Sequence, residues 1–279
     1  CLSKTMTSLT KTTLPIKTSK VKAEINKIIK ADVAILGDAK KALLKLIELV
    51  KPNTHDEWVN EFKECYKIEN QKVIKKDLYP TKEILTMGEV VRIVSEKVNA
   101  DAIIVTDVGQ QQMIASRYSK FKQSRSFITS GGLGTMGFGV PAAMGAKLGR
   151  PDREVVAIVG DGGFQMTMQE LGTISQYQIG VKIIIMENNY LGMVRQWQQL
   201  FFDKRYSFTK LQNPDFVKLA DAFSIPARKV TRREDLTLAI NEMIDHKGPY
   251  LLEVVVEKED NVFPMVPAGA SVAKIILEP

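Results

Sequence analysis

The sequence predicts an α/β fold: a doubly wound, mostly parallel sheet forms the main domain, and a remnant of a second α/β domain precedes it. Three observations lead to this prediction. Short apolar runs rich in β-branched residues recur after residue 83, segments of helical periodicity separate them, and small glycine-bearing loops follow several of them. Apolar runs that alternate with helices are typical of βαβ units around a buried parallel sheet.

We expect four of these runs to be strands, at residues 102–105, 155–159, 181–186 and 251–256. They would lie in a single domain over residues 83–279. Ligands of doubly wound sheets bind at the carboxyl ends of the strands, in the loops that lead into helices. Functional residues are therefore expected in those loops.

Residues 1–82 are predicted to hold a poorly ordered N-terminal segment, the remnant of a central domain, and a linker. Residues 1–23 show no clear period, and we expect them to be irregular. The rest should contain, in order, a helix from residue 24, a strand at 33–36, an amphipathic helix at 39–50, a helix at 54–67 and a lysine-rich linker at 68–82.

The net charge of +7 is concentrated at one end of the chain, where residues 1–30 carry seven lysines and one glutamate. A charged end rich in Lys, Thr and Ser is more typical of a solvated tail than of a nucleic-acid-binding face. We therefore expect no nucleic-acid partner. No run approaches the roughly 18 apolar residues of a membrane span, so no membrane association is expected either.

Few residues are available for thiol or imidazole chemistry. The two cysteines, Cys1 and Cys65, form neither a disulfide framework nor a zinc site, which favours a reducing compartment such as the cytoplasm. The two histidines, His55 and His246, leave little room for a Ser-His-Asp triad or a His-rich metal site. The chain starts without a signal peptide or an initiator Met, so we expect it to be a fragment.

Two glycine-bearing loops follow strand-like runs. In residues 107–113, Gly109 precedes Gln110 and Gln111 at the start of a predicted helix, where free N–H groups suit an anion such as a diphosphate. Residues 130–139 contain five glycines, which would bring the backbone close to a flat ligand. A plain turn in the first loop and a purely structural role for the glycines of the second are the alternatives.

A third loop gives the strongest indication of chemistry. The run at 155–159 ends in Gly160-Asp161-Gly162-Gly163, and the run at 181–186 ends in Glu187-Asn188-Asn189. One β-α-β crossover separates Asp161 from Asn188, so a carboxylate and an amide oxygen would meet at neighbouring strand ends. Hard oxygen ligands suit Mg²⁺, which completes its octahedron with phosphate oxygens and water. A capping Asp and a turn Asn are the alternative.

Gly160-Asp161-Gly162, followed at this distance by Asn188-Asn189, resembles the diphosphate–magnesium signature of the thiamine diphosphate (ThDP)-dependent enzymes. Further segments narrow the resemblance to the C-terminal part of the large catalytic subunits of acetolactate synthases. These segments are residues 130–139, 164–171, 192–198, 213–216 and 263–270. The resemblance extends from about residue 23 to the end of the chain.

The resemblance implies ThDP and Mg²⁺ as cofactors. Asp161 and Asn188 would bind Mg²⁺ through their side chains, and Tyr190 would bind it through its backbone carbonyl. Gly109, Gln110 and Gln111 match the family's other diphosphate anchor, although Gln111 stands where a histidine is frequent. Glutamine keeps an N–H donor there but has no titratable group.

The remaining cofactor and substrate residues also follow from the resemblance. Gly162, Gly163 and Gly192 belong to the matched cofactor loops. The backbone carbonyl of Gly134 would accept a hydrogen bond from the aminopyrimidine of ThDP. The residues expected to take part in catalysis are Met136, wedged between the two cofactor rings, and Met193 and Trp197 on the substrate side.

In the resembled family, a Trp at the position of Trp197 favours 2-ketobutyrate over pyruvate as the second substrate. For Met136 the alternative is a core filler, and for Trp197 it is a buried aromatic side chain on a helix face.

The implied activity is the decarboxylation of pyruvate and the transfer of its two-carbon unit to a second 2-keto acid, pyruvate or 2-ketobutyrate, in branched-chain amino-acid biosynthesis. The resemblance further implies a homodimer or tetramer, a small regulatory subunit as a candidate partner, and FAD in the full-length family. No segment resembles the domain that supplies the family's catalytic glutamate, and residues 24–50 match only the end of the flavin domain. We therefore expect the chain alone to be inactive.

Two other functions stay open. Another ThDP-dependent enzyme that uses pyruvate, such as a pyruvate oxidase or a 2-keto acid decarboxylase, would share the cofactor loops, but residues 192–198 and 264–270 argue against it. A non-catalytic ThDP-binding fragment is the second alternative, which the lysine-rich residues 1–22 favour. A dehydrogenase is disfavoured, because residues 132–137 fit the pattern G-x-G-x-x-G but lack its acidic partner.

Overall fold

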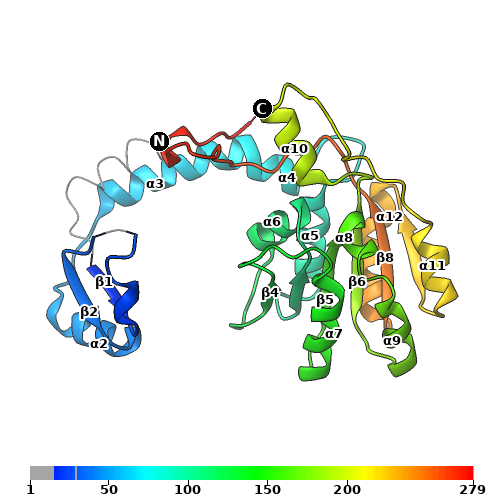
Figure 1. The fold of residues 1–279 in the computed structure, drawn as a ribbon, viewed down its shortest axis with the longest axis horizontal. Coiled ribbons are helices and arrows are strands. Elements are labelled where there is room, and N and C mark those ends of the chain that lie inside the picture. The colour runs from blue at the N-terminus through cyan, green and yellow to red at the C-terminus, as the bar shows by residue number, and fades with distance from the viewer. Residues whose placement is uncertain (1–15, 29, 279) are drawn as a thin grey trace. The chain divides into compact units, whose positions relative to one another are not determined.

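The computed structural model describes residues 16–28 and 30–278, which form two compact units (Figure 1). The first unit contains the described part of Cys1–Gln71 together with Pro264–Glu278, and the second contains Lys72–Phe263. Contacts within the chain group residues 264–278 with the first unit. The sequence predicts a domain boundary at residue 82, and this boundary stays a prediction. Residues 1–15, which we expected to be irregular, lie outside the described residues.

The first unit is built on a parallel pair of short strands, β1 (Ile16–Ser19) and β2 (Val33–Leu36). The 3-10 helix η1 (Lys22–Glu24) lies between them, and α2 (Ala39–Leu49) follows β2. The Asp38 side chain caps α2 by accepting the N–H of Lys41 at 3.2 Å. The expected strand at 33–36 and the helix after it are confirmed. The expectation of irregular structure was wrong for residues 16–19, and that of a helix from residue 24 was wrong as well.

The second helical segment of the chain is longer than expected. Helix α3 (Asp56–Glu69) continues through the π-helical turn η2 (Asn70–Ile74) into α4 (Lys75–Leu78). The predicted linker over residues 68–82 is therefore helical as far as Leu78. The reason is that residues 54–79 contain no glycine or proline, and the first residue that breaks a helix is Pro80.

The C-terminal segment of the first unit contains the 3-10 helix η3 (Val272–Lys274) and an antiparallel bridge between Met265 and Ile276. No helix within residues 16–28 and 30–278 combines the length and the apolar character that a bilayer crossing requires.

The second unit contains a six-stranded sheet in which every pairing is parallel and the strand order is β4-β3-β5-β6-β8-β7. The strands are β3 (Ile103–Thr106), β4 (Phe127–Thr129), β5 (Val155–Gly160), β6 (Lys182–Glu187), β7 (Ala227–Val230) and β8 (Tyr250–Val255). The α/β class and the four expected strands are confirmed. The sequence missed β4, which has three residues, and β7, whose Ala-Arg-Lys-Val lacks an apolar run.

Helices cover both faces of this sheet (Figure 1), as a doubly wound fold requires. The helices of the second unit, besides α4, are α5 (Met87–Lys97), α6 (Gln110–Tyr118), α7 (Gly139–Gly149), α8 (Asp161–Gln165), α9 (Glu170–Tyr177), α10 (Gly192–Phe201), α11 (Phe216–Ala222) and α12 (Arg233–Asp245). Alternate strand residues point to opposite faces. Thus Ile158 and Ile184 pack with α5, α6 and α12, whereas Ala157 and Ile183 pack with α7, α9 and α11.

The strand order reverses between β3 and β5. After β3 the chain crosses through α6 to β4 on one side, and after β5 it crosses through α8 and α9 to β6 on the other side. Helices α6 and α9 lie on opposite faces of the sheet. The loops after β3 and β5 therefore diverge, and the crevice between them is where ligands of such sheets bind.

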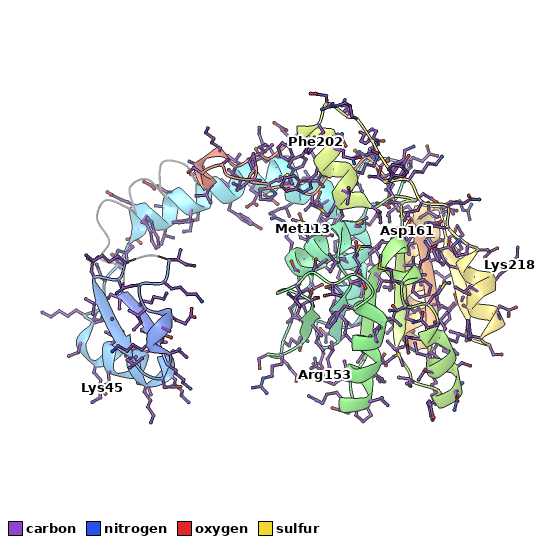
Figure 2. The ribbon with its side chains drawn as sticks, in the orientation of Figure 1. Lys45, Met113, Arg153, Asp161, Phe202 and Lys218 are labelled. Atoms are coloured by element: carbon purple, nitrogen blue, oxygen red, sulfur yellow. The ribbon has the colours of Figure 1, made fainter. Side chains whose placement is uncertain are left out.

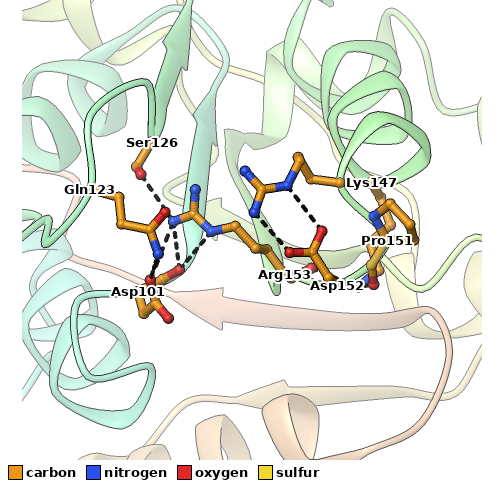
Figure 3. A network of polar contacts seen from close by, with 8 residues as sticks. Asp101, Gln123, Ser126, Lys147, Pro151, Asp152 and Arg153 are labelled. Atoms are coloured by element: carbon orange, nitrogen blue, oxygen red, sulfur yellow. Dashed lines mark hydrogen bonds and ion pairs between the residues drawn. The ribbon is translucent and has the colours of Figure 1, made fainter.

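A polar network closes the opposite end of the sheet (Figure 3). The buried Arg153 guanidinium donates to the backbone carbonyl of Asp101 at 2.6 and 3.1 Å and to the Ser126 hydroxyl at 2.9 Å. These contacts tie the amino end of β5 to the segments that precede β3 and β4. Figure 2 shows Arg153 and Asp161 at opposite ends of the sheet, so the network lies far from the loops that carry the expected site.

Replacement of Ser126 by alanine tests the contribution of this network to stability. The Ser126→Ala variant removes one hydrogen bond from a buried charged donor, so the free energy of unfolding should fall by about 1 to 2 kcal/mol. Urea denaturation measures the change. The control is Asp152→Ala, which breaks an exposed ion pair with Arg150 and should leave stability unchanged within error. Equal stabilities of Ser126→Ala and the parent chain would contradict the assignment.

Candidate functional site

A pocket opens at the carboxyl ends of β3, β5 and β6, at the reversal of strand order. It brings together most of the residues that the sequence placed in three separate loops. Its lining consists of Met87, Val108, Gly109, Gln110, Gln111, Met136, Gly160, Asp161, Gly162, Gly163, Met186, Asn188, Tyr190, Leu191 and Gly192.

Asp161 lies at the junction of β5 and α8 and is only 2% exposed. Its Oδ1 accepts the N–H of Gly162 at 2.9 Å, and its Oδ2 accepts the N–H of Asn189 at 2.7 Å and the side-chain amide of Asn213 at 2.9 Å. Burial raises the pKa of Asp161 above its ordinary 3.8, against the opposing effect of these hydrogen bonds. A cation beside this carboxylate would favour its ionised form.

Asn188 follows β6, the strand paired with β5, as the crossover spacing predicted. Its Oδ1 accepts the N–H of Tyr190 at 3.0 Å, which closes a tight turn. Asn189 in this turn has a φ of 61°, in the left-handed region that Asn tolerates better than most residues. That conformation directs the Asn189 N–H toward Asp161, so the two loops hold each other.

The two glutamines at the start of α6 are buried and make contacts within the protein. The Gln110 amide donates to Gln196 Oε1 and to the backbone carbonyl of Asp260, both at 3.0 Å. The Gln111 amide donates to the carbonyl of Val108 at 3.0 Å. Gln111, which stands where the resembled family often has a histidine, therefore closes its own loop.

Asp107 connects all three loops, and the sequence analysis did not select it. Its carboxylate accepts the N–H groups of Val108 at 2.8 Å, Gly137 at 3.1 Å and Gly139 at 2.8 Å. A Cβ atom at Gly163 would collide with the Asp107 carboxylate, so only glycine fits there. The sequence does carry a signal for Asp107, because it follows a buried strand as Asp161 does.

Three of the expected residues lie away from the pocket lining. Gly134 is exposed in its loop, with a φ of 63°, and no atom lies within 4 Å of the place of a Cβ. Met193 and Trp197 lie on α10, and Trp197 lines a separate surface groove with Val194, Gln198, Phe202 and Arg205. Met136 does line the pocket, close to the backbone of Gly162. The catalytic and binding roles of all these residues stay predictions.

An ion cluster lies at the carboxyl ends of β6, β7 and β8, next to the loop after β6. Lys229 Nζ contacts Glu187 Oε2 at 2.8 Å and also pairs with Glu253. Burial, and then the hydrogen bond to Glu187, raise the pKa of Glu253 from its ordinary 4.5 to about 7. Glu253 Oε2 is buried and has no hydrogen-bond partner within the described residues, which also disfavours the charged form.

Residues 107–254 match the family described as thiamine pyrophosphate enzyme, C-terminal TPP binding domain. The chain belongs to this family. The matched range starts at Asp107, includes the loops after β3, β5 and β6, and ends within β8.

Its thiamine pyrophosphate enzyme relatives include acetolactate synthase large subunits. The chain is 43% identical over 255 residues to the acetolactate synthase isozyme 2 large subunit of Escherichia coli K12. The alignment covers 91% of this chain and 45% of that protein. It is 41% identical over 249 residues to the large subunit of Lactococcus lactis, which covers 88% of this chain and 42% of that protein. Acetolactate synthase 1, chloroplastic, of Nicotiana tabacum is 39% identical over 270 residues, 92% of this chain and 40% of that protein. The chain thus spans less than half the length of these curated relatives.

The pocket fits a diphosphate cofactor with Mg²⁺. Asp161, Asn188 and the carbonyl of Tyr190 are hard oxygen donors, the class that Mg²⁺ prefers. Within the described residues no cluster of three or more His, Cys, Asp or Glu side chains is arranged to hold a metal. Mg²⁺ commonly completes such a set of protein oxygens with phosphate oxygens and water. A Cβ atom at Gly109, Gly162 or Gly192 would collide with a side chain of the lining, that of Gln111, Leu191 or Gln110 respectively.

The role of the Asp107 carboxylate can be tested by its effect on the loop at residues 137–139. Asp107→Ala leaves the N–H groups of Gly137 and Gly139 without their acceptor, so the free energy of unfolding should fall by about 3 kcal/mol. Amide hydrogen exchange at Gly137 and Gly139 should accelerate more than tenfold relative to exchange at Ile183 in the sheet. Uniform acceleration across the second unit would show that Asp107 does not hold this loop specifically.

The raised pKa of Glu253 predicts a pH-dependent stability. A group whose pKa is raised on folding contributes stability below its ordinary pKa of 4.5, and this contribution is lost as the pH rises through about 7. Glu253→Gln stays neutral, so its stability relative to the parent chain should rise by about 2 kcal/mol between pH 5 and pH 8. Urea denaturation at the two pH values measures this. The Glu242→Gln variant, in a pair with Arg228 at the surface, is the control. An unchanged difference between Glu253→Gln and the parent would contradict the prediction.

Proposed function

We propose that this chain is the cofactor-binding part of an acetolactate synthase, and that it binds ThDP together with Mg²⁺. The observation that carries the proposal is the pairing of Asp161 and Asn188 at neighbouring strand ends, in a pocket at the reversal of strand order. The family match supports the same cofactor, and the acetolactate synthases among the relatives support the same reaction.

In this proposal the protein holds the cofactor and keeps the pocket poor in water. Asp161, Asn188 and the Tyr190 carbonyl bind Mg²⁺, and the start of α6, after Gly109, holds the diphosphate. Gln110 and Gln111 shape the loop through their contacts within the protein. ThDP, when bound, would supply the nucleophilic carbon needed for the decarboxylation of pyruvate and for the transfer of its two-carbon unit. Met136 would separate the cofactor rings from its place in the lining.

The substrates proposed are pyruvate, and either pyruvate or 2-ketobutyrate as the second 2-keto acid. The groove beside Trp197 supports an apolar acceptor side chain, because Val194 and Phe202 share its lining. Arg205 lines the same groove and supplies a cation suited to a keto-acid carboxylate. Met193, on the same helix, would lie on the substrate side. Assembly into a homodimer or tetramer, a small regulatory subunit, and FAD are proposals for the whole protein.

Titration of ThDP into the chain by calorimetry, with and without Mg²⁺, tests the cofactor site. We expect binding that depends on Mg²⁺, and Asp161→Ala should abolish the Mg²⁺-dependent part because it removes the sole carboxylate proposed as a ligand. Ser126→Ala, at the other end of the sheet, should bind as the parent chain does. Absence of Mg²⁺-dependent binding in the folded parent chain would refute the proposal.

The reaction is tested in a chimera in which residues 23–279 replace the matched part of the E. coli isozyme 2 large subunit. Acetolactate formed from pyruvate supports the proposed activity. Acetaldehyde or acetyl phosphate as the main product would favour another pyruvate-utilising ThDP enzyme, and no turnover despite ThDP binding would favour a non-catalytic module. The 279-residue chain alone is expected to form no acetolactate.

A further inference from the structure

Asn213 has no role in the proposed function, yet its side chain contacts the expected metal ligand. It lies in the segment between α10 and α11. Its Nδ2 donates to Asp161 Oδ2 at 2.9 Å, and also lies 3.2 Å from both Glu187 Oε1 and Asn189 Oδ1. Its Oδ1 accepts the amide of Gln165 at 2.9 Å. A single side chain thus joins the loop after β5 to the loop after β6.

These contacts distinguish the two oxygens of Asp161. Oδ2 accepts two hydrogen bonds, from the Asn189 N–H and from Asn213, whereas Oδ1 accepts one, from the Gly162 N–H. A carboxylate oxygen has two lone pairs in the carboxylate plane. Oδ2 is therefore fully used, and Oδ1 is the oxygen that keeps a lone pair for a cation.

The Asn213 amide also lies between two acidic side chains. Glu187 and Asp161 both face it, and without a donor between them the two carboxylates would repel each other. Glu187 is in turn paired with Lys229. A chain of polar contacts therefore runs from Lys229 through Glu187 and Asn213 to Asp161. It holds the Asp161 carboxylate through Oδ2.

The segment that carries Asn213 is itself held on two sides. The N–H of Leu211 donates to the carbonyl of Asn189 at 2.8 Å, beside the bridge between Tyr190 and Lys210. After Asn213, the ring of Phe216 is fully buried and packs edge-to-face on Phe164 of α8 at 5.5 Å between centroids. The amide is thus positioned by the two loops whose side chains it contacts.

We propose that Asn213 is a positioning residue for the metal ligand Asp161: it holds Oδ2 and thereby leaves Oδ1 to bind Mg²⁺. The inference rests on the proposed cofactor site and adds to it a residue to which the resemblance assigned no role. Hydrogen-bond partners behind a metal ligand commonly change metal affinity by 10- to 100-fold when they are removed.

The test measures Mg²⁺ affinity by calorimetric titration of the full chain in the presence of ThDP. For Asn213→Ala we expect a dissociation constant for Mg²⁺ that is about 10- to 100-fold higher than that of the parent chain. Gln165→Leu removes the bond that fixes the orientation of the Asn213 amide, together with a weaker one to the backbone carbonyl of Asp161 at 3.2 Å, and should weaken Mg²⁺ binding in the same direction but less. Gln165 is only half-buried, so Gln165→Leu is expected to fold. It can therefore test the positioning role if Asn213→Ala fails to fold.

Thermal unfolding without Mg²⁺ separates positioning from plain structural support. Ser126→Ala, the control, should lower the unfolding temperature but leave Mg²⁺ affinity unchanged. If folded Asn213→Ala, or Gln165→Leu in its place, binds Mg²⁺ within twofold of a parent chain that does bind, the positioning role is refuted and the proposed cofactor site stands. If the parent chain itself shows no Mg²⁺-dependent binding of ThDP, the cofactor site fails and the inference fails with it.

Discussion

Parallel pairing of all six strands is the constraint on which the site depends. It places the carboxyl ends of β3, β5 and β6 along one edge, so the loops that follow them must share a small volume. The reversal of strand order between β3 and β5 sends the next helices to opposite faces and leaves a crevice between these loops. An antiparallel strand at either position would carry its loop to the far edge, where Arg153 closes the sheet.

Acidic side chains hold the loops together at this edge. Each of them is bound by hydrogen-bond donors or by a lysine of the protein itself. Asp107 accepts three backbone N–H groups, Asp161 accepts two backbone N–H groups and one amide, and Glu187 and Glu253 share Lys229. Buried polar groups need such partners because desolvation without them is costly. The loops therefore have a defined arrangement before any cofactor arrives.

Much of the fold could be predicted from the sequence because strands buried on both faces have a strong apolar signature. The runs that became β3, β5, β6 and β8 were found for this reason, whereas β7 was missed because its sequence, Ala-Arg-Lys-Val, is half charged. Residues 68–82 are rich in lysine and end in Tyr79-Pro80-Thr81, a pattern that predicts a linker, although residues 68–78 are helical. Charge does not prevent helix formation, and no glycine or proline did so there.

Sequence spacing by itself predicts proximity in the candidate site only where one crossover joins its parts, whereas Gly109, Gln110, Gln111 and Met136 were expected there from their glycine-bearing loops and from the resemblance. Asp161 and Asn188 belong to successive strands, so their proximity followed from sequence spacing. Asn213 reaches the same carboxylate from a segment beyond α10, and no local pattern places it there. The sequence also could not show that Trp197 lies on a separate groove, because the direction of α10 depends on tertiary packing.

The close approach of Gly163 to Asp107 has a consequence for how this site can change over evolutionary time. The carboxylate of Asp107 occupies the space that any side chain at position 163 would need. A substitution at 163 is therefore accessible only after residue 107 has become smaller, and that earlier step removes the acceptor from the loop at 137–139. Lineages that carry a side chain at position 163 are therefore expected to carry a smaller residue at position 107 as well.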